Sequence, residues 1–116
     1  MKKVYHLSSC STCQRIIKEL QLKEKGFLLQ DIKAEKITAL QLDQMIEMAG
    51  SVEPLFSTKA IKYRELGLKD KKLTDKDKKN YILSEYTFLK RPVIIMDSNI
   101  YVGSSSLILS KLKALL

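Results

Sequence analysis

Long apolar runs are missing from this sequence, and so are internal repeats and low-complexity linkers. No stretch of about 18 consecutive apolar residues occurs, which argues against a membrane-spanning helix. The apolar part of the N-terminal stretch MKKVYHLSSCS is also far too short for the core of a signal peptide. We therefore expect a cytoplasmic protein that has no membrane partner.

Histidine and cysteine are scarce, with one His and two Cys in the chain. A zinc site would have to recruit His6, Cys10 and Cys13, whereas structural zinc usually takes four ligands. We therefore expect no metal. A stable structural disulfide is disfavoured in a reducing cytosol, so the Cys-x-x-Cys pair indicates transient redox chemistry. The alternative is that the two cysteines are inert, buried, small residues.

What is present is the composition of one globular domain covering residues 1–116, with 45% apolar and 29% charged residues. The net charge is +8, and the excess of lysine and arginine is heaviest in residues 59–80. Such a surface can attract an oxyanion, a nucleic acid or an acidic protein, but the interleaved aspartates favour a solvated lysine-rich face. No nucleic-acid motif accompanies the charge, so we expect no direct nucleic-acid binding.

The first third of the chain has the pattern strand, helix, strand. The stretch KVYHL predicts a short strand, and apolar spacing predicts a helix from about Thr12 to Lys25 that stops at Gly26. FLLQDI predicts a second strand, parallel to the first across a right-handed crossover.

The middle of the chain is predicted to be helical. A capping box of Thr38 and Gln41 begins a helix that closes at Gly50. STKAIKYRELG, residues 57–67, predicts a second helix, and TDKDKKNYILSEYTFL, residues 74–89, predicts a third one capped by Thr74.

The last part predicts a hairpin and a helix. VIIM and IYVG are strands separated by the turn-forming residues 97–99. One of the serines 104–106 caps a final helix, whose core-facing residues are predicted to be Leu107, Ile108, Leu112 and Leu115. The order βαβ, helices, ββα is that of an α/β thioredoxin-like fold with a helical insertion at approximately residues 35–90.

In this arrangement Cys10 lies at the N-terminus of the first helix and Cys13 in its first turn. The unpaired amides and the helix dipole favour a thiolate there, so Cys10 is the expected nucleophile and Cys13 the resolving thiol. The loop residues are small and polar, which lets their backbone amides bind an anion; they are Ser8, Ser9, Ser11 and Thr12.

Two further features bear on the site. His6 is either a structural histidine that orients the loop or a substrate-binding one. At Arg91-Pro92 a thioredoxin-like fold places a cis proline before its hairpin, which would direct the cation of Arg91 toward Cys10. The alternative for Arg91-Pro92 is an ordinary junction between a loop and a strand.

In these residues and motifs the sequence resembles the arsenate reductase (ArsC) family, which includes the Spx regulators and the YffB-like reductases. VYHLSSC is similar to the strand that leads to the family's nucleophilic cysteine, with a histidine four residues earlier. FLKRPVIIMDSNIYVG is similar to the Arg-Pro hairpin segment, and KYRELGL in the insertion also matches.

The resemblance implies a thiol-dependent reductase in which Cys10 attacks a small oxyanion or a disulfide and Arg91 and Pro92 help to bind it. It implies no bound cofactor, with glutathione and glutaredoxin, or thioredoxin, as electron donor and partner. CSTC resembles the Spx switch, which makes Cys13 the second thiol.

The sequence departs from the family at three arginines. Gln14, Ser57 and Gly103 stand where the family has arginine, and Lys59 or Arg64 are candidates to compensate. The alternative function is an Spx-like regulator that binds RNA polymerase, with the cysteine pair as an oxidation switch.

Overall fold

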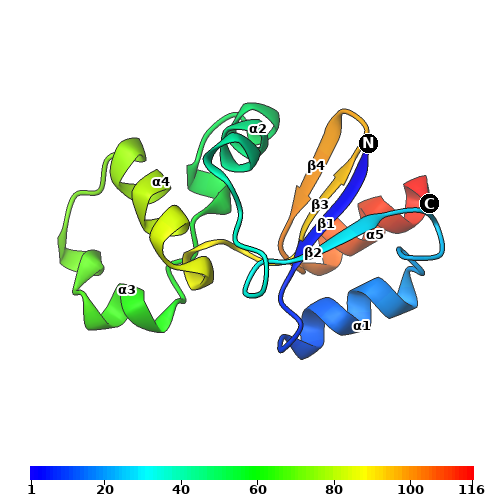
Figure 1. The fold of residues 1–116 in the computed structure, drawn as a ribbon, viewed down its shortest axis with the longest axis horizontal. Coiled ribbons are helices and arrows are strands. Elements are labelled where there is room, and N and C mark those ends of the chain that lie inside the picture. Colours follow the sequence, from blue (N-terminus) through cyan, green and yellow to red (C-terminus); the bar gives the residue numbers. More distant parts are fainter. The chain divides into compact units, whose positions relative to one another are not determined.

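The computed structural model describes residues 1–116, and the chain divides into two compact units. The sheet unit combines the segments Met1–Glu35 and Arg91–Leu116, and the insertion is the segment Lys36–Lys90. Figure 1 labels the elements of both units.

The sheet unit holds all four strands of the chain and two helices. Their bounds are β1 Lys2–His6, α1 Ser11–Glu19, β2 Leu28–Asp31, β3 Val93–Met96, β4 Asn99–Val102 and α5 Ser106–Leu115. The strand order is β2-β1-β3-β4; β1 is parallel to β2, and the other pairs are antiparallel. This is the thioredoxin-like βαβ…ββα fold, with the insertion between its halves.

One hydrophobic cluster joins the sheet to both helices. Its fully buried members include Val4 on β1, Ile16 on α1, Ile94 on β3 and Leu112 on α5. The side chains of α1 and α5 therefore pack against the same cluster, and burial of this apolar area is what holds the helices to the sheet.

The predicted core face of α5 is half right. Leu112 is fully buried and Ile108 packs against the cluster, but Leu107 is 64% and Leu115 56% exposed. Leu109 and Leu116 pack against the cluster instead. Helix α5 begins at the N-cap Ser105, one of the predicted caps, whose side chain accepts from the amide of Ile108.

Helix α1 is shorter than predicted, since it ends at Glu19 and not at Lys25. Gln21 has φ +52°, so the chain leaves the helix in a left-handed turn. This turn brings Leu22 into the core, where it is fully buried and its carbonyl accepts from the amide of Phe27. Burial of Leu22 thus takes precedence over helix continuation.

The hairpin between β3 and β4 is tighter than predicted, because Asn99 already belongs to β4. Asp97 takes the turn with φ +55°, its amide donates to the carbonyl of Met1, and its carboxylate pairs with the N-terminal ammonium at 3.2 Å. The turn is therefore held by the first residue of the chain.

The insertion contains the helices α2 Ala39–Ala49, α3 Ile61–Glu65 and α4 Asp75–Ser84. Helices α2 and α4 both begin with a complete capping box, formed by Thr38 with Gln41 and by Thr74 with Asp77. Lys79 on α4 pairs with Asp43 on α2 at 2.8 Å.

Two of the predicted helices of the insertion are shorter than expected. Residues before Ile61 are not helical because Phe56 pairs with Leu89 in an isolated bridge and the amide of Ser57 donates to the carbonyl of Phe88. Helix α4 ends at Ser84, and a short 3₁₀ turn then buries Phe88. There its ring stacks on that of Phe56 with centroids 5.4 Å apart.

No helix of the structure combines the length and the apolar character that crossing a membrane would require.

Candidate active site

Cys10 is the N-cap of α1, at the end of the short loop that follows β1. Its backbone is extended, its amide donates to the carbonyl of Leu7 at 2.9 Å, and its carbonyl accepts from the amide of Gln14 at 3.1 Å. The first amides of a helix have no partner within the helix. The Cys10 sulfur therefore lies where backbone donors are available to it.

The pKa of the Cys10 thiol lies below its ordinary value. Partial burial acts to raise this pKa, but the amides of Cys13 and Thr12, the Cys13 side chain and the charge of Arg91 together lower it more. Donors and a cation stabilise the charged form of a thiol, so Cys10 is the more acidic thiol of the pair.

Cys13 has the opposite character. It is fully buried, and burial raises the pKa of its thiol to about 11, with further contributions from a hydrogen bond to the Cys10 side chain and from the Cys10 charge. An amide contact with Leu7 and the Arg91 charge act in the other direction. Both cysteines are free thiols, so the pair consists of one thiolate-prone sulfur and one protonated sulfur.

His6 is the last residue of β1 and is 8% exposed. Its Nδ1 lies 3.1 Å from the side-chain nitrogen of Gln14, and the same nitrogen donates to the carbonyl of Leu7 at 3.1 Å. Burial lowers the pKa of His6, although the carboxylate of Asp31 on β2 acts to raise it. His6 is therefore held mainly in the neutral form.

The peptide bond between Arg91 and Pro92 is cis, as the sequence predicted. Pro92 is buried immediately before β3, and its carbonyl accepts from the amide of Gly103 at 2.9 Å. Arg91 is half-buried, and its charge acts on both Cys10 and Cys13. The structure thus brings the cation of Arg91 to the thiol pair.

The remaining loop residues line the start of α1. Ser11 is the exposed first residue of the helix, whereas Thr12 is half-buried and gives its amide to the Cys10 sulfur. The side chain of Ser8 contacts the carboxylate of Asp31, which is the main reason that the pKa of Asp31 is lowered. This contact ties the loop to β2.

The structure therefore gathers every predicted site residue within the sheet unit; they are His6, Cys10, Ser11, Thr12, Cys13, Arg91 and Pro92. Sequence reasoning missed two neighbours, because Gln14 was read only as a missing arginine and Asp31 was not considered. The signals were their positions: Gln14 follows Cys10 by one helical turn, and Asp31 is the register partner of His6 across β1 and β2.

Two of the positions that lack the family's arginine adopt their own local structure. Gly103 has φ +90° at the end of β4, a conformation that favours glycine. The side chain of Ser57 accepts from the amide of Lys59 at 3.3 Å within the insertion.

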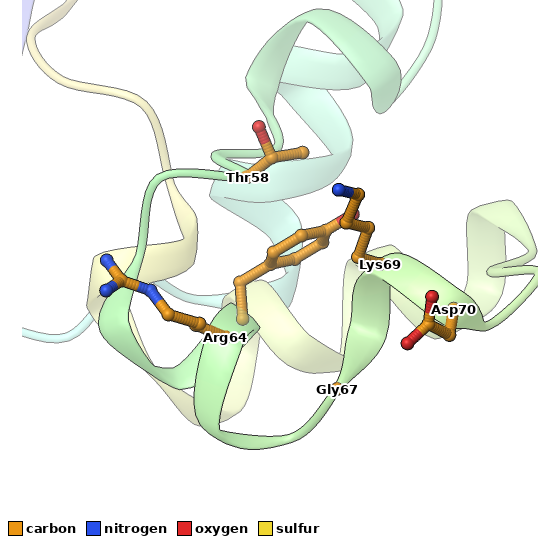
Figure 2. A pocket seen from close by; sticks show the side chains of 6 residues that line it. Thr58, Arg64, Gly67, Lys69 and Asp70 are labelled. Carbon is orange, nitrogen blue, oxygen red and sulfur yellow. The ribbon is translucent and has the colours of Figure 1, made fainter.

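The insertion also holds an open hollow of about 360 Å³, shown in Figure 2. It is lined by Thr58, Tyr63, Arg64, Gly67, Lys69 and Asp70. Arg64 and Lys69 lie on different sides of it in Figure 2. That Arg64 or Lys59 compensates for a missing anion-binding arginine stays a prediction.

Fold and site together define a thioredoxin-like protein with a free dithiol at the start of its first helix. The family model of the ArsC family matches residues 5–108. The chain belongs to the ArsC family.

Solved structures agree with this assignment. A protein from Staphylococcus aureus COL is 31% identical, with a TM-score of 0.75 over 96% of this chain and 97% of that one. A possible arsenate reductase from Streptococcus mutans UA159 is 29% identical, with a TM-score of 0.74 over 91% and 92%. The arsenate reductase from Vibrio cholerae, 16% identical, shares the fold with a TM-score of 0.79 over 99% and 97%. No curated protein matches the sequence.

Proposed function

We propose that this protein is a cytoplasmic thiol-dependent oxidoreductase in which Cys10 attacks a small oxyanion, or a disulfide, and Cys13 resolves the adduct. The observation that carries the proposal is the asymmetry of the two thiols. The pKa of Cys10 is lowered, whereas that of Cys13 is raised to about 11. A nucleophile that is ionised before its resolving partner is what an ordered two-thiol reaction requires.

Arsenate is the oxyanion that the family membership favours. In the first step the Cys10 thiolate attacks arsenic and an As–S bond forms. One arsenate hydroxyl then leaves as water after it takes up a proton. The positive charge of Arg91, together with amide donors such as that of Thr12, stabilises the anionic adduct.

Cys13 reacts second because its thiol is the less acidic of the two. Burial, the hydrogen bond to the Cys10 side chain and the Cys10 charge all act to raise its pKa. The Cys10 sulfur loses its own charge when it bonds to arsenic, so burial and the charge of the adduct then oppose ionisation of Cys13.

In the second step the Cys13 thiolate attacks the Cys10 sulfur. The S–S bond forms, the As–S bond breaks with its electron pair passing to arsenic, and arsenite leaves after protonation. An external dithiol, thioredoxin or the glutathione and glutaredoxin pair, then returns two electrons and two protons to the disulfide and is itself oxidised. This cycle uses no bound cofactor.

The other site residues have supporting roles in this proposal. Pro92 and the exposed Ser11 bound the space beside the nucleophile, and His6 contributes a neutral imidazole to substrate binding. Because Ser57 and Gly103 stand where the family has anion-binding arginines, fewer cations meet the oxyanion, and each lost charge-assisted contact costs about 1.5–3 kcal/mol of binding. We therefore expect a high KM for arsenate.

The test is arsenate-dependent NADPH oxidation, coupled separately to thioredoxin and to glutathione with glutaredoxin. We expect turnover in the wild type, none in Cys10→Ser, and an accumulating Cys10 adduct, visible by mass spectrometry, in Cys13→Ser. Ser110→Ala, an exposed change on α5, is the control variant. Equal turnover in Cys10→Ser and the wild type would reject the proposal.

A second candidate is a redox-switch regulator of the Spx type that binds RNA polymerase. The contact between the Cys10 and Cys13 side chains supports it, because it places two free thiols where they can form a reversible disulfide. A pull-down with the C-terminal domain of the polymerase α-subunit tests it: retention of only the oxidised wild type supports the regulator. Equal behaviour of Cys13→Ser and the wild type rules it out.

A further inference from the structure

Gln14 makes two contacts with one nitrogen atom. Its side-chain amide nitrogen lies 3.1 Å from the carbonyl oxygen of Leu7 and 3.1 Å from Nδ1 of His6. The Leu7 carbonyl also receives the amide of Cys10 at 2.9 Å. Gln14 thus reaches back from the first turn of α1 and joins the end of β1 to the loop that carries the nucleophile.

The Leu7 carbonyl decides which way the Gln14 amide faces. A carbonyl oxygen only accepts, so the amide group opposite it must be the NH₂ and not the oxygen. The second proton of that NH₂ then faces Nδ1 of His6. A nitrogen that faces a donor must be an acceptor, so Nδ1 carries no proton.

This arrangement selects one form of the histidine. The neutral tautomer with its proton on Nε2 satisfies the contact. In the other tautomer and in the imidazolium, a protonated Nδ1 would face the NH₂ of Gln14, so that two donors would meet. The charge that acts on His6 from the neighbouring strand is the Asp31 carboxylate, which favours protonation. Burial and the Gln14 donor act against it.

We propose that Gln14 is a positioning residue that fixes His6 as the neutral imidazole with its proton on Nε2, leaving Arg91 as the cation of the Cys10 site. The inference rests on the proposed role of Cys10. It follows that the positive charge beside the nucleophile at pH 7 belongs to Arg91, because a guanidinium keeps its proton. It also follows that His6 can offer the substrate an N–H donor at Nε2 but no free acceptor, because Nδ1 faces Gln14.

The test is nitrogen-15 NMR of the imidazole in the full chain without an affinity tag. His6 is the only histidine, so every imidazole signal belongs to it. We expect the wild type to show a protonated Nε2 and an unprotonated Nδ1 at pH 7. In Gln14→Glu an acceptor replaces the donor at the same length, so the titration midpoint of His6 should move upward.

Two further variants complete the design. Gln14→Met removes the donor without adding charge, and we expect the preference for the Nε2 tautomer to weaken. Gln44→Glu adds the same charge on an exposed position of α2 and should leave the His6 signals unchanged. A proton on Nδ1 in the wild type, or identical titrations of wild type, Gln14→Glu and Gln14→Met, would overturn the inference.

The readout separates this inference from the proposed function. Cys10 alkylation by iodoacetamide, followed in the same samples, reports the nucleophile and not the tautomer. If Cys10 reacts as a thiolate while His6 shows the wrong tautomer, the role of Gln14 fails alone. If His6 behaves as expected while Cys10 is unreactive, the proposed function fails and the role of Gln14 in setting the tautomer remains.

Discussion

The amide of Gly103 donates a hydrogen bond to the carbonyl of Pro92 at 2.9 Å. This bond joins the end of β4 to the residue that precedes β3, directly beside Arg91. Gly103 makes it with φ +90°, and an added Cβ would meet no atom within 4 Å.

Gly103→Ala should therefore destabilise the protein through its backbone and not through a clash. We expect the free energy of unfolding to fall by about 1–3 kcal/mol, measured by urea denaturation. Gly103→Arg, which introduces the family's arginine, should show a similar loss. Ser104→Ala, an exposed neighbour, is the control and should change stability by less than about 0.5 kcal/mol.

The two leucines of α5 that sequence reasoning treated alike should behave differently. Leu112→Ala removes a fully buried side chain from the core cluster, so we expect a loss of about 2–5 kcal/mol. Leu107→Ala changes a side chain that is 64% exposed and should be nearly neutral. Equal losses in thermal or urea unfolding would contradict the packing of α5 described here.

Stability should fall as the pH drops below the ordinary histidine value of about 6.5. The pKa of His6 is lowered in the folded state, so the unfolded chain binds the proton more tightly, and acid favours unfolding. We expect the free energy of unfolding to be constant above this value and to decline between pH 6.5 and 5. The measurement uses the Cys10→Ser background, so that the thiolate makes no contribution. In that background His6→Gln should abolish the decline, and an unchanged decline would show that another group causes it.

Arg91 should set the reactivity of Cys10. Its charge lowers the pKa of that thiol, so in Arg91→Met the midpoint of the pH profile of alkylation should move upward and the rate at pH 7 should fall. Mass spectrometry identifies the alkylated cysteine. Arg15→Met removes an exposed cation on α1 and serves as the matched control. A profile that moves equally in both variants would indicate a general charge effect.

Sequence reasoning succeeded where local chemistry determines structure. The Thr38 and Thr74 caps and the strand-helix-strand pattern around the Cys-x-x-Cys follow from short-range preferences. The cis bond before Pro92 was expected from the thioredoxin-like arrangement that this pattern indicated. It failed where the end of an element depends on a contact with residues far away in the sequence. The end of α1 depends on the burial of Leu22, which no helix propensity encodes.

The site shows the same division. Cys10 and Cys13 were found from their spacing, because a helix N-terminus affects a thiol in any fold of this kind. The contact between Gln14 and His6 was not predicted, because it depends on the path of the loop between β1 and α1. Comparison with a family pattern drew attention to the arginine that is absent and away from what glutamine does in its place.

The pairing of β1 with β3 has a consequence for how the chain is made. Lys2 pairs with Met96, so β1 can pair with β2 soon after it leaves the ribosome but must wait for its second neighbour, β3, until much more of the chain has been made. At ordinary rates of synthesis this delay is roughly 5–20 s, during which one edge of β1 has no partner. Thermodynamically the spacing matters little, because doubling a loop adds only about 0.6 kcal/mol of closure entropy. We expect ribosome-bound chains that stop before Arg91 to be digested rapidly by protease, and full-length released chains to resist. The chain is therefore most exposed to proteolysis during its synthesis.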